Sequence, residues 1–344
     1  MSSQVMIKPE KKLGSQTLKF TNPPRILSTS TIVGPKEGEG PLQGSFDRVM
    51  SDSLKGEKTW EKAEQKMLQE ALEGAIIKAQ LKPNQIDFLL AGDLLNQLIS
   101  SNFTAKSMGI PFFGLYGACS TMAESLVLGS MLIDGGYANY VLAGASSHYD
   151  TAERQYRFPT EMGVQRPLAA QWTVTGAGGF ILTNQSNTGA KITFATVGKV
   201  MDMGISDAND MGSAMAPAAA DTIIQHFKDT GRTPIDYQLI ITGDLGSLGK
   251  TLTQHLVEKA GYDISQIYSD CGILIYDPTQ DTHSGGSGCG CSSVVMGGHI
   301  MNQINQGKYE RVLYVGTGAL LSPTSTQQGE TIPGIGHAVA IENN

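Results

Sequence analysis

The chain has 344 residues, of which 40% are hydrophobic and 17% are charged, and its formal net charge is −7. This length is enough for about two domain-sized units with a large buried core. The acidic balance, with no basic block to offset it, excludes a nucleic-acid surface, and no run of about 18 uncharged apolar residues predicts a membrane span.

Strand and helix patterns alternate along the chain, which is typical of an α/β fold with parallel strands. The stretch 60–81 has the spacing of an amphipathic helix, and 86–94, IDFLLAGDL, has the pattern of a buried strand. A Cys-Ser turn at Cys119 leads into an apolar helix. Thr121 and Glu124 have the spacing of a capping box, so this helix is expected to begin just after the cysteine.

The second part of the chain repeats these features. The strand pattern at 231–245 ends in the same Gly-Asp-Leu as 86–94. The sequence ACSTMAESLVLGSMLIDGGYANYVLAGAS aligns without gaps on GCSSVVMGGHIMNQINQGKYERVLYVGTG, which places Cys119 on Cys291, 172 residues later (291 − 119). Such internal repetition predicts a duplicated architecture.

The repeats predict two similar halves, residues 1–188 and 189–344, and GAGGFILT (176–183) matches GIGHAVAIE (334–342) as a third pair. The helices after the two Cys-Ser turns are apolar nearly all round, with small residues between the large ones. A helix that is hydrophobic on every face must be buried. We therefore expect these two helices to lie back to back between two sheets.

Duplicated halves, a cysteine at the start of a buried helix and a glycine-rich last strand together resemble the thiolase superfamily. The resemblance implies an α/β fold of five layers, α-β-α-β-α. Longer phrases are similar to a family of stage V sporulation proteins of endospore-forming bacteria and cover nearly the whole chain: GPKEGEGPLQG (34–44), AGDLLNQ (91–97), GACST (117–121), SSHYDTAERQYRFPTE (146–161), DMGSAMAPAAADTI (210–223), GGSGCGCS (285–292) and GTGALLSPT (316–324).

This resemblance implies a protein that binds dipicolinic acid, or its calcium chelate, and supports its uptake into the developing spore. It implies no cofactor, a peripheral location on the cytoplasmic side of the spore inner membrane, SpoVA membrane proteins as partners, and a possible homodimer. The N-terminal sequence lacks the apolar stretch of a secretory signal. The four cysteines are therefore expected to be free thiols.

Cys119 stands where condensing enzymes of the superfamily carry their nucleophile. Those enzymes need a His, and an Asn or a second His, from the second half as proton carriers and oxyanion donors. Here Asp244 follows the strand that should lead to the His, and Gly288 falls at the Asn position. Because a nearby carboxylate raises the pKa of a thiol, we expect Cys119 to be a degenerate nucleophile that lines a binding site. The alternative is an acyl-transfer enzyme in which Cys119 pairs with His148 or His337.

The long segment 148–167 is expected to supply cationic contacts to a dianionic ligand, because arginine binds carboxylates in a bidentate manner. Its arginines are Arg154, Arg157 and Arg166. The competing interpretation is a solvated lid in which these arginines pair with Glu153 and Glu161. The expected ligand site therefore comprises Cys119, His148, Arg154, Arg157, Arg166, Asp244 and His337.

Two further motifs fall short of a known site. GDLGSLGKT (243–251) nearly matches a phosphate-binding loop, but Asp244 stands where that loop requires its first glycine. Zinc-binding residue types occur at Cys271, His283, Cys289 and Cys291, but a Cys-x-Cys pair lacks the spacer of common structural zinc sites. The sequence therefore predicts neither a nucleotide site nor a metal site.

Overall fold

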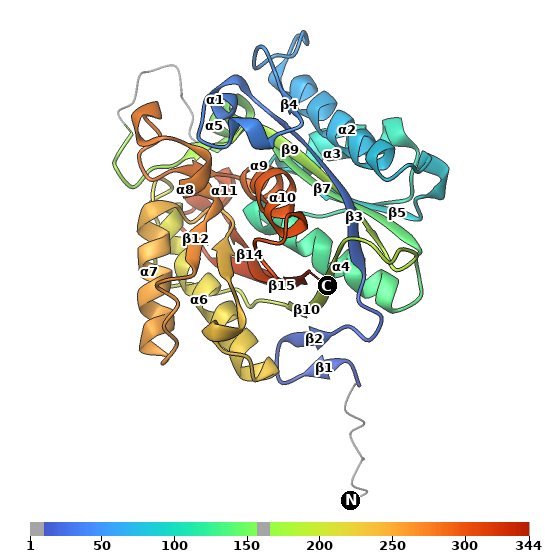
Figure 1. The fold of residues 1–344 in the computed structure, drawn as a ribbon. Coiled ribbons are helices and arrows are strands. Elements are labelled where there is room, and N and C mark those ends of the chain that lie inside the picture. Colours follow the sequence, from blue (N-terminus) through green and yellow to red (C-terminus); the bar gives the residue numbers. More distant parts are fainter. Residues whose placement is uncertain (1–9, 157–165, 344) are drawn as a thin grey trace, which may run out of the picture.

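The computed structural model describes residues 10–156 and 166–343. Within them, ten strands form two sets of five that lie side by side, in the orders β6-β5-β7-β9-β3 and β12-β11-β14-β15-β10 (Figure 1). The first set is β3 (Arg25–Val33), β5 (Phe88–Gly92), β6 (Phe112–Gly114), β7 (Tyr140–Ser147) and β9 (Gly176–Thr183). The second set is β10 (Ala190–Thr196), β11 (Leu239–Thr242), β12 (Tyr268–Asp270), β14 (Arg311–Ala319) and β15 (Gly334–Glu342).

The two sets have the same topology. In each, the second, third and fourth strands along the chain pair in parallel, and the fifth strand pairs antiparallel with the first and the fourth. A short antiparallel contact between β3 and β10 joins the sets. The duplication inferred from the sequence is therefore present in the strand order, while a boundary after residue 188 stays a prediction.

The antiparallel pairs also repeat in register. Gly144 on β7 lies opposite Gly179 on β9, and Gly316 on β14 lies opposite His337 on β15. Gly316 follows Gly144 by the same 172 residues that separate the two Cys-Ser turns (316 − 144). Since a slip of one residue would turn every side chain to the other face, this agreement supports the gapless alignment of the repeats.

The parallel pairs do not repeat in register. On β5, Gly92 lies opposite Ala145, whose counterpart in the second half is Thr317. On β11, Thr242 lies opposite Val315. Continuing this register would place Gly243 opposite Gly316, one residue before Thr317. The two Gly-Asp-Leu sequences are thus similar in text but shifted by one residue in the fold.

Helices cover the outer face of each set and fill the space between them (Figure 1). The outer helices are α2 (Trp60–Lys78) and α3 (Ile99–Met108) on the first set, and α6 (Met211–Thr230) and α7 (Gly246–Lys259) on the second. Between the sets lie α4 (Thr121–Asp134) and a continuous helical stretch of α9 (Cys289–Val294), the π-helical η8 (Val295–Ile300) and α10 (Met301–Asn305). The five-layer prediction is confirmed.

The remaining elements are short. They are β1 (Lys12–Leu13), β2 (Thr17–Lys19), α1 (Pro35–Gly38), β4 (Arg48–Val49), α5 (Tyr149–Tyr156), β8 (Trp172–Thr173), α8 (Cys271–Ile275), β13 (Gly286–Ser287) and α11 (Pro323–Gln327). No helix in the described part of the chain combines the length and the apolar character that a membrane crossing requires.

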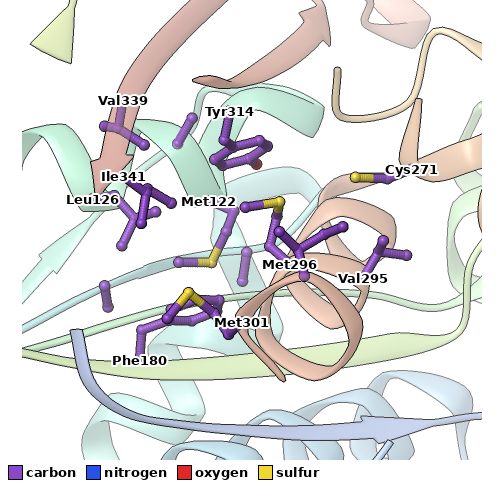
Figure 2. Close-up of a cluster of buried hydrophobic side chains, with 14 of the residues drawn as sticks. Met122, Leu126, Phe180, Cys271, Val295, Met296, Met301, Tyr314, Val339 and Ile341 are labelled. Carbon is purple, nitrogen blue, oxygen red and sulfur yellow. The ribbon is translucent and has the colours of Figure 1, made fainter. Parts of the chain in front are cut away.

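The central layer is closely packed. Met122 of α4 and Met296 of η8 meet between the sets, beside Phe180, Tyr314 and Val339 from the strands on either side (Figure 2). All five side chains are fully buried. As expected from the sequence, the two inner helices are largely apolar and buried: α4 packs against strands of both sets, and α9 packs against α4 and against β3, β7 and β9.

Candidate functional site

A short 3-10 turn, η4 (Ala118–Ser120), places Cys119 directly before α4. The side chain of Cys119 is buried, at 5% exposure, and α4 begins at Thr121 as expected. The capping-box prediction is wrong, however. Ser120 is the N-cap and makes no side-chain cap bond, and Thr121 Oγ1 donates to the carbonyl of Ala118 at 2.7 Å. Glu124 Oε2 is buried and has no hydrogen-bond partner in the described part of the chain.

Asp244 lies in contact with Cys119, so the structure brings together residues from the two halves. The carboxylate of Asp244 accepts hydrogen bonds from Thr317 Oγ1 at 2.8 Å and from the N–H of Gly288 at 2.8 Å. The hydroxyl of Ser287 lies 3.5 Å from the same carboxylate. Both Asp244 and Thr317 are completely buried.

This environment determines the protonation of the pair. Burial raises the pKa of Asp244 to about 7, against the opposing effect of its hydrogen bonds. Burial also raises the pKa of the Cys119 thiol well above its usual value, and the carboxylate of Asp244 raises it further. Cys119 is therefore a protonated thiol at neutral pH, a poor nucleophile.

The aspartates of the two Gly-Asp turns have different hydrogen-bond partners. In the first half, Asp93 accepts the N–H of Leu95 at 2.9 Å and the N–H of Ser101 at 2.7 Å, and so stabilises the start of α3. In the second half, the turn that starts α7 is stabilised by Asp270, whose carboxylate accepts the N–H groups of Leu245 and Gly246. The one-residue shift of β11 frees Asp244 to face Cys119.

A pocket opens beside Cys119. Its lining is mostly apolar and comes from both halves: Leu94, Ala118, Cys119, Ala152, Glu153, Tyr156, Thr173, Met211, Ser287, Ala319 and Leu321. Within the described residues the lining contains one acidic side chain, Glu153, and no basic one. Apolar walls with a few polar groups are typical of small-molecule sites.

The two histidines of the expected site do not line this pocket. His148 is buried, its Nε2 donates to the carbonyl of Ser53 at 2.8 Å, and its Nδ1 accepts the N–H of Asp150 at 3.3 Å. Burial lowers the pKa of His148. His337 accepts the N–H of Gly198 at Nδ1, at 3.2 Å, and burial lowers its pKa to about 4. Both rings make structural contacts.

The described arginines do not line the pocket either. Arg154 forms an ion pair with Glu61, and its guanidinium lies 5.4 Å from the ring centre of Trp60. Arg166 binds Asp281, with Nη2 at 2.6 Å from its carbonyl oxygen and 3.0 Å from its carboxylate. Arg157 and Glu161 lie outside the described residues.

Several lining residues were not predicted. Tyr156, Met211, Ala319 and Leu321 are ordinary apolar residues, so no local signal sets them apart. Thr317, which binds Asp244 and is not part of the lining, carried a weak signal, because the Gly-Thr-Gly that contains it lies near the end of a buried strand. Among the described residues, no three metal-binding side chains lie close enough together to hold an ion.

Layer order, duplicated topology and a pocket beside a helix-start cysteine define the thiolase superfamily fold. Solved structures agree on the fold. The chain resembles 3-oxoacyl-acyl-carrier-protein synthase III from Aquifex aeolicus (TM-score 0.56, 14% identity, covering 93% of this chain and 100% of that one). It also resembles a variant of OleA from Xanthomonas campestris (0.62, 12%, 94% and 99%) and human mitochondrial 3-ketoacyl-CoA thiolase (0.55, 14%, 94% and 98%).

Within that class the family is specific. The model of the family described as Stage V sporulation protein AD (SpoVAD) matches residues 14–342. Stage V sporulation protein AD of Bacillus subtilis (strain 168) is 50% identical over 332 residues, which are 96% of this chain and 98% of that protein. The chain belongs to the stage V sporulation protein AD family.

Proposed function

We propose that this protein is a ligand-binding member of the thiolase fold, not an acyl-transfer enzyme, and that its ligand is dipicolinic acid. The observation that carries the proposal is the contact between Cys119 and Asp244. Acyl transfer needs a thiolate and a proton carrier beside it, whereas this thiol faces a buried carboxyl group and neither His148 nor His337 lines the pocket.

The pocket beside Cys119 suits a flat ring between apolar walls. The hydroxyl group of Thr173 is on the lining and can donate to one carboxylate of the ligand. Glu153 is acidic and the described lining has no basic side chain, so this lining favours a ligand whose own charge is reduced. The calcium chelate of dipicolinate meets this requirement better than the free dianion.

We extend the proposal to the cellular role. The protein would hold dipicolinate at the spore inner membrane and deliver it to SpoVA membrane proteins for loading into the spore. The edge strand β6 has no partner on its outer side among the described strands, and Phe113 on it is 48% exposed. This unpaired edge supports the proposal of a homodimer.

Calorimetric titration with dipicolinate, with and without calcium, tests the proposal. Pyridine-2-carboxylate, which has one carboxylate, should bind at least about tenfold more weakly, since a hydrogen bond to a charged group contributes roughly 1.5–3 kcal/mol. Ala319→Phe should fill the pocket and abolish binding, whereas Ile235→Phe, at a position that is 90% exposed, should not change it.

Two results would contradict the proposal. One is equal binding of dipicolinate by Ala319→Phe and the parent. The other is turnover of an acyl-thioester that disappears in Cys119→Ala, because it would establish the acyl-transfer alternative.

A further inference from the structure

A cationic cluster surrounds Trp172, on the side of β8 that faces away from the pocket. The neighbouring residue Thr173 lines the pocket, and successive side chains of a strand point to opposite faces. Tyr149 stacks on the indole of Trp172, with ring centres 3.8 Å apart and planes inclined by 9°. The indole is thereby fixed in place and available as a platform for cations.

Two cationic side chains lie close to the indole ring of Trp172. Lys36 Nζ lies 4.3 Å from the ring centre of Trp172, and the guanidinium carbon of Arg166 lies 4.9 Å from it. Lys36 Nζ donates a hydrogen bond to the carbonyl of Gln280, at 2.6 Å. Arg166 directs Nη2 to Asp281, while its Nη1 is buried and has no hydrogen-bond partner among the described residues. An arginine with one engaged and one unpaired terminal nitrogen can still donate a hydrogen bond to an oxyanion.

His283 completes the cluster. Its Nδ1 lies 2.8 Å from the carbonyl of Pro167, and its Nε2 lies 3.1 Å from the carboxylate of Asp281. Both ring nitrogens therefore face hydrogen-bond acceptors. Arg166 and His283 thus contact a single carboxylate, that of Asp281, and Lys36 binds the backbone carbonyl of the preceding residue, Gln280.

The carboxylate of Asp281 is held in an unusual way. Its side chain is 77% exposed, and its backbone is in the left-handed region, at φ 54°. The other acid nearby, Glu37, is turned inward, where it accepts the N–H of Thr175 at 3.0 Å and the hydroxyl of Tyr276. Asp281 is therefore the one described carboxylate that contacts both Arg166 and His283, and its exposure leaves it free to be displaced.

We propose that Lys36, Arg166 and His283 form a second binding site, for a small oxyanion such as a carboxylate or a phosphate. The carboxylate of Asp281 occupies this site when no oxyanion is bound. The incoming oxyanion takes the place of the Asp281 carboxylate between the guanidinium and the imidazole. This site is separate from the pocket beside Cys119 and does not depend on the proposed binding of dipicolinate there.

Trp172 provides a direct readout, because the chain has only two tryptophans. In a Trp60→Phe background, inorganic phosphate at low ionic strength should change the Trp172 fluorescence with a saturable dependence. A parallel titration with dipicolinate distinguishes a carboxylate ligand from a phosphate ligand. Arg166→Gln should weaken binding of the effective anion by about tenfold or more, as expected for loss of a charge-assisted hydrogen bond.

Asp281→Asn is the decisive variant. Asparagine tolerates the left-handed backbone, so the loop should keep its shape while the competing charge is removed. The variant should therefore bind the oxyanion more tightly than the parent, by about tenfold. A merely structural role of Asp281 would give weaker or unchanged binding.

Matched controls define the outcome. Arg48→Gln, at an exposed arginine paired with Glu70, and the pocket variant Ala319→Phe should both leave the titration unchanged. Circular dichroism verifies folding, and Lys36→Gln replaces Arg166→Gln if the latter is unfolded. The proposal is overturned if neither anion gives a saturable signal, if the cation variant binds like the parent, or if Asp281→Asn does not bind more tightly.

Discussion

At the scale of single residues, the most instructive comparison is between Asp93 and Asp244. Each is the central residue of a Gly-Asp-Leu sequence, yet Asp93 stabilises the start of a helix and Asp244 contacts the thiol of Cys119. The difference follows from the one-residue shift of β11. Because successive side chains of a strand point to opposite faces, this shift turns the aspartate at the end of the strand in another direction.

Asp244→Asn should make Cys119 more reactive. Removing a nearby negative charge lowers the pKa of a thiol, by about one unit or more when the charge is in contact, so alkylation by iodoacetamide at pH 8 should be about tenfold faster. Mass spectrometry of the Cys119 peptide measures the rate. Asp263→Asn, at an exposed aspartate, is the control. Unchanged alkylation would mean that burial alone suppresses the thiol.

At the scale of elements, the approach of α4 to β14 decides how the layers fit. A Cβ atom on Gly316 would lie 2.5 Å from Cβ of Ala123 on α4 and 3.3 Å from the carbonyl oxygen of Ser120. A contact of 2.5 Å is far shorter than van der Waals distance, so either the helix or the strand would have to move. Glycine is required here for close packing between layers.

Gly316→Ala should therefore destabilise the protein by about 1–3 kcal/mol, the usual cost of overpacking a core. Urea denaturation measures the free energy of unfolding. Gly44→Ala is the matched control, because a Cβ atom there would meet nothing within 4 Å. A loss of stability in Gly316→Ala no larger than in the control would show that the helix can shift without cost.

At the scale of the whole molecule, the buried ionisable groups govern the response to acid, and His226 is the clearest case. It lies on α6 with Nδ1 2.8 Å from Thr196 Oγ1 of β10, and Nε2 2.5 Å from the hydroxyl of Tyr237. Burial lowers the pKa of His226 to about 3. The folded protein therefore keeps this ring neutral over a range in which the unfolded chain binds a proton.

Since the folded pKa lies below the usual value of 6.5, the stability that His226 contributes is present at pH 7 and is lost as the pH falls toward 3. Buried acids such as Asp244 act in the opposite direction over the same range. Comparison with His226→Gln isolates the histidine. Between pH 7 and pH 5, the parent should lose about 2 kcal/mol more unfolding free energy than the variant. Parallel curves for the two proteins would contradict this assignment.

The sequence by itself determined the architecture. Alternating apolar patterns predicted the α/β class, and the gapless match from Cys119 to Cys291 predicted the repeated topology. These features depend on periodicity along the chain, which is a local property. The proximity of Asp244 to Cys119 followed from the resemblance to condensing enzymes, because Asp244 stands after the strand that should lead to their histidine.

Only the tertiary structure decided which side chains share a site. His148, His337 and Arg154 have the right chemistry, but their partners are Ser53, Gly198 and Glu61, and those partners are 95, 139 and 93 residues away in sequence. The direction of a side chain depends on strand register and on the segments packed against it. Register and long-range packing are set by contacts between distant parts of the chain, so no local pattern could predict them.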